Sequence, residues 1–275
     1  MKIAIIGTGN LGKSIAKGIL KTANISSLYL TKRNTETLNN FEISNNVSIT
    51  SNNSQAIQNS DVLIFAVQPS SFEKILKTNK TLFKKNHVII ATVTGFSIKR
   101  IEAIIGKHHA IIRAMPNTAI AVAKSMTCLS FNECGLEKIP VAEMVFNPLG
   151  NCLTIPESQM QAATVICASG IAFWMRLIRA TTQAAIQLGF DAKEAQELAM
   201  FTSQGAASLL IQTKNHPEEE IDKVTTPKGC TIEGLNEMEN KGLSASLIQG
   251  IVASFNKINS IKKNNYESIQ CIQTI

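Results

Sequence analysis

The residues best suited to chemistry lie near the start of the chain, in the run Gly7-Thr8-Gly9-Asn10-Leu11-Gly12. Apolar residues precede this run and an amphipathic segment follows it, which is typical of a strand, a tight turn and a helix. Gly7 would allow the sharp turn, Gly9 would let a pyrophosphate approach the backbone, and Gly12 would let the helix pack closely. A helix N-terminus also offers free N–H groups to phosphates. We therefore expect a dinucleotide site; the alternative is a turn that is merely rich in glycine.

Polar residues also follow the next predicted strand, at Thr31, Lys32, Arg33 and Asn34. Sites for NAD usually place an acidic residue at this point, where it binds the ribose hydroxyls. Two cations and two small polar groups suit the 2′-phosphate of NADP instead. The pattern favours NADP, and a solvated loop with incidental charges is the alternative.

A third candidate site interrupts the helical second half of the chain at Val224-Thr225-Thr226-Pro227-Lys228-Gly229-Cys230-Thr231. A new helix is predicted to start near Thr231 or Ile232. The free N–H groups at its N-terminus would suit a carboxylate. An ordinary loop at the start of a helix explains the same residues equally well.

The elements that position these residues alternate between strands and helices. Strands are predicted at 3–6, 28–31, 47–50, 62–65, 88–91, 110–113, 126–129 and 152–155, and helices at 11–21, 72–82 and 98–105. This order indicates an α/β fold with a parallel sheet, a Rossmann-type dinucleotide-binding domain. Ligands of such sheets lie at the carboxyl ends of the strands, so residues 66–69 should border the cofactor, and residues 92–95 follow at the next carboxyl end.

From Ser158 onward the pattern is helical almost throughout and rich in closely spaced Ala, Ser and Gly. Helices that are apolar on most faces need a partner on most faces. We expect residues 1–157 to form the NADP-binding domain and 158–275 an all-helical dimerisation domain. The uncharged segment Ser158 to Met175 is long enough to span a membrane, but its polar residues favour a helix buried in a bundle or a subunit interface.

Composition narrows the function classes further. The chain of 275 residues has 27 Lys and Arg against 20 Asp and Glu, a net charge of +7. The basic residues are scattered and aromatic residues are few, so no nucleic-acid surface is expected. Six cysteines include no C-x-x-C pair, which indicates reduced, mostly buried thiols in a cytoplasmic protein. The chain begins directly with a strand, so no signal peptide is expected.

The motifs together resemble the pyrroline-5-carboxylate reductase family over nearly the whole chain. The glycine run matches the family fingerprint, 66–69 matches A-V-K-P, and 113–118 matches R-x-M-P-N-T. Ser169-Gly170 falls within S-G-S-G-P-A-Y, His216-Pro217 matches an H-P at a helix end, and 224–231 corresponds to V-T-S-P-G-G-T-T.

The resemblance implies roles for individual residues. The residues assigned to the cofactor are Gly7, Thr8, Gly9, Asn10, Leu11, Gly12, Thr31, Arg33, Asn53, Ala66, Val67, Gln68, Pro69, Thr94, Gly95 and Asn117. Those assigned to the substrate are Val224, Gly229, Cys230 and Thr231. The Thr231 hydroxyl, near the ring nitrogen, is the candidate catalytic group.

The family also implies a reaction and an assembly. The reaction is hydride transfer from NADPH, with NADH possible, to the C=N carbon of 1-pyrroline-5-carboxylate, which gives L-proline. The helical domain would form an interleaved homodimer with a shared substrate site, and the dimers could build a decamer. No metal or membrane partner is implied. The four histidines lack metal spacing, and His216 is expected to end a helix.

The chain departs from the family pattern at several positions. Gln68 replaces a usual Lys, Lys228 a usual Gly, and Cys230 a small or hydroxyl residue, and Cys167, Ala168, Ile171 and Phe173 depart from S-G-S-G-P-A-Y. The competing interpretations are a related NADP-dependent imine or β-hydroxyacid reductase and a non-catalytic NADP sensor. β-Hydroxyacid dehydrogenases use a lysine on the long interdomain helix, and residues 158–187 contain none.

Overall fold

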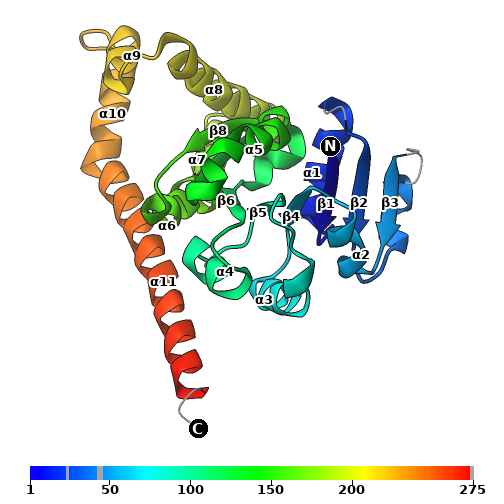
Figure 1. The fold of residues 1–275 in the computed structure, drawn as a ribbon. Helices are drawn as coiled ribbons and strands as arrows, with labels where there is room; N and C mark the ends of the chain where they lie inside the picture. Colours follow the sequence, from blue (N-terminus) through cyan, green and yellow to red (C-terminus); the bar gives the residue numbers. More distant parts are fainter. Residues whose placement is uncertain (23–24, 42–45, 273–275) are drawn as a thin grey trace. The chain divides into compact units, whose positions relative to one another are not determined.

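The computed structural model describes residues 1–22, 25–41 and 46–272. The chain divides into two compact units, Met1–Ala168 with Ile261–Ile275, and Ser169–Ser260. The first unit carries the strands and the second is helical (Figure 1). This confirms the predicted α/β fold with a helical C-terminal region.

An eight-stranded sheet forms the centre of the first unit in the described part of the chain, in the order β3-β2-β1-β4-β5-β6-β7-β8. Its strands are β1 (Lys2–Ile6), β2 (Ser27–Thr31), β3 (Val47–Thr50), β4 (Val62–Phe65), β5 (Val88–Ala91), β6 (Ala110–Met115), β7 (Ser125–Phe131) and β8 (Gly150–Thr154). The order reverses between β1 and β4, and ligands of such sheets bind where the order reverses.

The sheet departs from the expected parallel arrangement at one pair of strands. All neighbouring pairs are parallel except β6 and β7, which are antiparallel. Only residues 116–124, which contain the 3-10 turn Thr118–Val122, separate these two strands. A parallel connection needs a crossover of a dozen or more residues, so this short link forces the chain to reverse.

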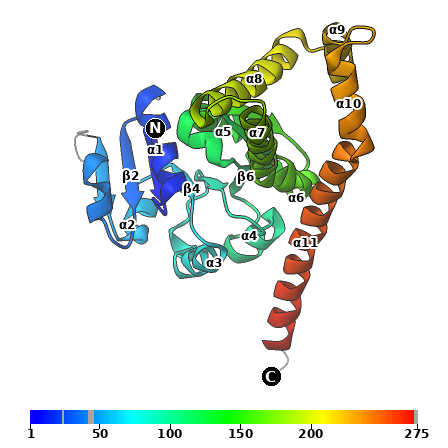
Figure 2. The same cartoon turned by 180° about the vertical axis from the view of Figure 1, so that it is seen from behind.

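Helices cover both faces of the sheet (Figures 1 and 2). Helices α1 (Asn10–Thr22) and α5 (Ile139–Phe146) pack on one face, whereas α2 (Asn53–Gln58), α3 (Pro69–Thr78) and α4 (Ile98–Ile105) pack on the other. Within β1, Ile3 and Ile5 face the first layer and Ala4 and Ile6 the second, because successive side chains of a strand point to opposite faces.

Helix α3 begins and ends earlier than the expected 72–82. It starts at Pro69, whose fixed φ suits the first helical position and whose missing N–H costs nothing there. It ends at Thr78, and a separate 3-10 turn, Lys80–Leu82, follows Asn79.

The helical region begins with α6 (Met160–Ala163), a wide π-type turn (Thr164–Ser169) and α7 (Gly170–Gln187). The chain continues with α8 (Ala192–Thr213), α9 (Pro217–Val224), α10 (Cys230–Asn240) and α11 (Leu243–Ile272). Helices α7 and α8 pack against each other. Gly189, with φ +107°, and the cap Asp191 lie in the turn that joins them.

The expectation for His216 was wrong, because His216 starts a helix rather than ending one. It is the N-cap of α9, and its Nδ1 accepts a hydrogen bond of 3.3 Å from the Glu218 amide. The following Pro217 is at the first helical position, so the dipeptide has the cap-and-proline pattern of a helix start.

The second unit leaves large apolar side chains exposed. Trp174, Leu188, Phe201 and Ile211 are mostly accessible to solvent. Within the described residues, one helical run, Glu157–Gln187, is long and apolar enough to cross a membrane, and 17% of its most apolar window is buried. A single run of this kind is weak evidence for a membrane span.

Candidate functional site

The first unit contains an open cleft of about 1390 Å³ at the carboxyl ends of its strands. Its walls come from the glycine turn, the end of β2, the start of α2, and the segment that joins β4 to α3. The predicted cofactor residues that line it are Gly7, Thr8, Gly9, Asn10, Leu11, Thr31, Arg33, Asn53, Ala66, Val67, Gln68, Pro69 and Thr94. A volume above the usual range of ~300–1,000 Å³ for ligand pockets leaves room for an extended dinucleotide.

The three glycines of the turn differ in the space around them. Gly7 has φ +96°, and a Cβ there would collide with Val67 and the Ala66 carbonyl. A Cβ on Gly12 would meet the Gly7 carbonyl oxygen, whereas a Cβ on Gly9 would meet nothing within 4 Å. Gly7 and Gly12 are therefore required by the protein's own packing. Gly9 faces open space, and this space is where a phosphate would approach the backbone.

Thr31 holds the turn against the end of β2. Its carbonyl oxygen accepts hydrogen bonds from the Gly7 amide at 3.2 Å and the Thr8 amide at 2.8 Å. Its buried hydroxyl also accepts from the Gly7 amide, at 3.3 Å. The structure thus places Thr31 beneath the glycine turn, where its polar atoms position the turn.

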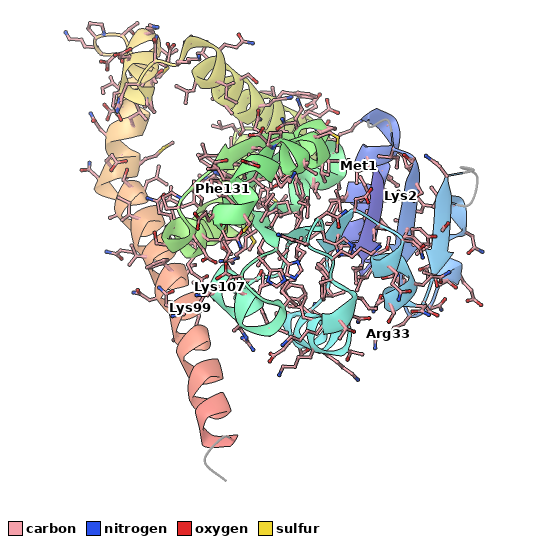
Figure 3. The ribbon with its side chains drawn as sticks, viewed as in Figure 1. Met1, Lys2, Arg33, Lys99, Lys107 and Phe131 are labelled. Atoms are coloured by element: carbon pink, nitrogen blue, oxygen red, sulfur yellow. The ribbon has the colours of Figure 1, made fainter. Side chains whose placement is uncertain are left out.

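Cations border the cleft on two sides. Arg33 is exposed just beyond β2 (Figure 3). Lys32 donates from Nζ to the Thr37 hydroxyl at 2.7 Å, so its ammonium group is tied to the loop. Lys74 reaches the cleft from α3. The net result is a positively charged rim that suits an anionic ligand.

Several residues that line the cleft were not among the predicted cofactor residues. They are Ser51, Asn52, Ser54, Ser71, Lys74, Ile75, Thr78, Asn79 and Thr92. Lys32 and Asn34, which were grouped with Arg33 as candidates for the 2′-phosphate, also line the cleft. Ser71 and Lys74 are three positions apart, in the first two turns of a helix that starts directly after a strand end. That spacing puts both side chains on one helix face, and this was the available clue in the sequence.

Gly12, Gly95 and Asn117 do not line this cleft. Gly95 borders a smaller cavity of about 180 Å³, together with Ser97, Arg113, Glu157, Ser158 and Gln161. Buried Arg113 donates to Glu157 Oε1 at 3.0 Å, and the same oxygen accepts from the Ile98 amide at 2.7 Å. This ion pair ties β6 to the start of α4.

Asn117 has a structural role in the same region. Its Oδ1 accepts from the Ala119 amide at 3.0 Å, and its Nδ2 donates to the Cys167 carbonyl at 3.2 Å. The side chain therefore joins the end of β6 to the wide turn at 164–169.

The four predicted substrate residues lie in the second unit. Val224 ends α9, Gly229 is the N-cap of α10, and Cys230 and Thr231 open that helix. A Cβ on Gly229 would collide with Thr226, so this glycine is required. The neighbouring Lys228 has φ +61°, a left-handed conformation that favours glycine.

Comparisons with known proteins cover most of the chain. The profile of the pyrroline-5-carboxylate reductase dimerisation family matches residues 157–261. The profile of a family described as NADP oxidoreductase, coenzyme F420-dependent, matches residues 2–95. The cofactor of this chain is thus a nicotinamide dinucleotide, and the chain carries a region for self-association.

Individual relatives agree. Pyrroline-5-carboxylate reductase 1 of Dictyostelium discoideum is 40% identical over 94% of this chain, which spans about half (49%) of that protein. Pyrroline-5-carboxylate reductase 2 of the same organism is 38% identical over 93% of this chain and 91% of its own length. A solved pyrroline-5-carboxylate reductase from Coxiella burnetii superposes with a TM-score of 0.88 at 27% identity, over 94% of this chain and 97% of the other. The chain therefore belongs to the pyrroline-5-carboxylate reductase family and is an oxidoreductase.

Proposed function

We propose that this chain reduces 1-pyrroline-5-carboxylate to L-proline with a hydride from NADPH, the last step of proline biosynthesis. The observation that carries this proposal is the cleft, which brings the glycine turn, the cationic end of β2 and the β4–α3 segment together in one unit. When bound there, the nicotinamide ring supplies the hydride, while the protein supplies orientation and electrostatics.

The pyrophosphate would lie over Gly9, against the first free amides of α1. Replacing Gly9 with Ala tests this placement, because the new Cβ would enter open space and leave the fold undisturbed. We expect Gly9→Ala to unfold like the wild type and to bind NADPH at least about tenfold more weakly, a loss of ~1.4 kcal/mol. Gly12→Ala is the matched control, since its Cβ would strain the turn itself and lower the unfolding free energy.

The 2′-phosphate of NADPH would be bound by Arg33, with Thr31 holding the turn beside it. Arg33→Ala should weaken NADPH binding about tenfold or more, because a charged hydrogen bond of ~1.5–3 kcal/mol is lost. NADH lacks the 2′-phosphate and serves as the internal control. An equal loss of affinity for both cofactors would contradict this assignment.

The substrate carboxylate would be bound by the amides at the start of α10, with the Thr231 hydroxyl near the ring nitrogen. A protonated imine is already electrophilic, so the site's main task is to hold the imine carbon near the hydride donor. Thr231→Ala should lower kcat/KM for the imine while the Kd for NADPH stays unchanged. Equal losses in both quantities would remove Thr231 from this role.

Self-association completes the proposal. We place the domain boundary near residue 157, with 158–275 forming an interleaved homodimer whose subunits share the substrate site and could assemble into a decamer. The matched dimerisation profile and the exposed apolar side chains of α7 and α8 support the dimer. Free thiols throughout the described residues accord with a cytoplasmic location.

The decisive experiment follows cofactor oxidation with 1-pyrroline-5-carboxylate and either NADPH or NADH. Substrate-dependent oxidation that favours NADPH supports the full proposal. NADPH binding without turnover would instead favour a non-catalytic sensor, for which the left-handed Lys228 in the proposed substrate loop is the specific observation. Turnover of a different imine or of a β-hydroxyacid would point to a related reductase.

A further inference from the structure

Two thiols meet in the first unit, and neither cysteine lines the cleft. Cys128 lies on β7 and Cys167 lies in the wide π-type turn, and their Sγ atoms are 3.9 Å apart. They are 39 positions apart in the sequence, so only the fold brings them together. This contact is close enough for a weak hydrogen bond between the two sulfurs.

The two thiols differ in access to solvent. Cys128 is buried with Met115 and Met160 in a small apolar cluster, and Cys167 packs partly exposed against that cluster. Cys167 is thus the sulfur that a small reagent reaches first. Its position in a π-type turn is notable because such turns are rare and often mark functional sites.

The sulfurs also differ in acidity. A hydrogen bond from Cys128 lowers the pKa of Cys167 to about 7. The same hydrogen bond and burial raise the pKa of Cys128 well above its ordinary value. Cys167 therefore carries substantial thiolate near neutral pH, and thiolates are the nucleophilic form of cysteine.

The remaining described cysteines are not placed to compete. Cys152 pairs with Thr127 in the sheet, so it lies on the opposite face from Cys128 and packs in a different cluster. Cys134 is exposed, and its thiol donates to the Lys107 carbonyl. Cys230 is exposed in the second unit.

We propose that Cys128 and Cys167 form a redox-active pair that a peroxide converts into an intramolecular disulfide. The Cys167 thiolate attacks a peroxide oxygen and becomes a sulfenic acid, and hydrogen peroxide loses its other oxygen as water. The Cys128 sulfur then attacks the Cys167 sulfur, and the sulfenic oxygen leaves as a second water. The two thiols lose two electrons and two protons in total. The sulfurs must close from 3.9 Å to a bond of about 2.05 Å.

The pair is connected to the cofactor region by direct contacts. The Cys167 carbonyl accepts a hydrogen bond from Asn117 Nδ2. Met115 lies beside Cys128, and its Sδ is 4.0 Å from the hydroxyl of Thr94, which lines the cleft. Closing the disulfide moves both neighbours. We therefore expect the oxidised protein to bind NADPH several-fold more weakly. This effect on binding rests on the proposed function, but the formation of the disulfide is independent of it.

The test treats the purified 275-residue protein with hydrogen peroxide at neutral pH, blocks free thiols by alkylation, and maps peptides without reduction. We expect a peptide pair linked through Cys128 and Cys167, a mass loss of two hydrogens, and full reversal by a dithiol reductant. Irreversible sulfinic acid at Cys167 with a free Cys128 would overturn the proposal. Links that join Cys134 or Cys230 of two chains, without the 128–167 link, would also overturn it.

Variants sharpen the test. Cys128→Ser removes the resolving sulfur, so Cys167 should progress to sulfinic acid and the intramolecular link should vanish. Cys152→Ser is the matched control and should form the link at the wild-type rate. The Kd for NADPH is then measured before and after oxidation, where a mapped link with an unchanged Kd would overturn the coupling to the cleft.

Discussion

The two units bury their apolar residues in opposite ways. In the first unit, helices on both faces of the sheet enclose continuous clusters, such as Phe65, Phe72 and Phe96, which are almost fully buried. In the second unit, Phe201 and Trp174 are mostly exposed, and the buried apolar residues among those described are small, such as Ala195 and Ala199. Composition is therefore no guide to burial within one chain. The first unit completes its own core, whereas the second leaves apolar surface exposed that self-association would cover.

The largest expected effect comes from the first unit's core. Phe72 packs against Phe65 and Phe96, with ring centroids 5.0 and 4.9 Å away. Phe72→Ala should lower the unfolding free energy by about 3–5 kcal/mol, because a large buried ring leaves a cavity. Denaturant unfolding should show this loss equally at low and high protein concentration. Phe201→Ala is the contrasting variant, and its loss should appear only at concentrations where dimers form.

The next prediction concerns how the stability of the first unit depends on pH. Burial first, and then the charge of Lys84 and the neighbouring His109, lower the pKa of His87 to about 4 from 6.5, with Asp61 acting in the opposite sense. Below pH 6.5 the unfolded chain binds a proton that the folded chain does not, so stability falls until about pH 4. The loss is about 3 kcal/mol.

In the wild type the Lys84 amide donates a hydrogen bond of 3.2 Å to His87 Nδ1. His87→Asn tests the titration, because the asparagine side-chain oxygen can still accept that hydrogen bond. Urea unfolding at pH 7 and pH 4.5 should show that the unfolding free energy of this variant changes less with pH than that of the wild type. An unchanged slope for His87→Asn would contradict the assignment.

A charge introduced on the exposed apolar face of α8 should weaken self-association without changing the fold. Phe201 is 66% exposed on α8. Phe201→Asp should raise the dimer dissociation constant by roughly 30-fold or more, since placing an unpaired carboxylate in an apolar interface costs ~2 kcal/mol. Sedimentation measures the change. Leu136→Asp is the control in the first unit, where Leu136 is similarly exposed at 58%, and it should leave the dimer intact.

The smallest effect concerns backbone conformation. Lys228 has φ +61°, and Lys241 has an ordinary φ of −83°. Lys228→Gly should stabilise the protein by about 0.5–1 kcal/mol, because glycine adopts the left-handed region without steric cost. Lys241→Gly should stabilise nothing, which thermal unfolding can check. Equal effects at both positions would mean that backbone strain is not the cause.

The sequence alone predicted the strands well, for a physical reason, and most of the residues that it assigned to the cofactor line one cleft. Buried parallel strands are short apolar runs, so runs such as Val62–Phe65 and Val88–Ala91 stand out. The direction of β7 was not predicted, because it depends on the length of one turn. The contact between Cys128 and Cys167 joins positions far apart in the sequence, and no local pattern encodes it. The left-handed conformation of Lys228 is visible only in the backbone of the structure. The usual glycine at this position of the family motif was the available indication in the sequence.

The hydrogen bonds of Thr31 decide which amides can still meet a ligand. Gly7 and Thr8 have already given their N–H groups to Thr31, and Gly9 donates to the Gly7 carbonyl. The amides left free belong to Asn10, Leu11 and Gly12, in the first turn of α1, where no intrahelical acceptor exists. Hydrogen–deuterium exchange should therefore be slow at Gly7 and Thr8 without ligand, and cofactor should slow it only at the helix start. A bound anion would meet a turn that hydrogen bonds already hold in place, so little ordering entropy would oppose its binding.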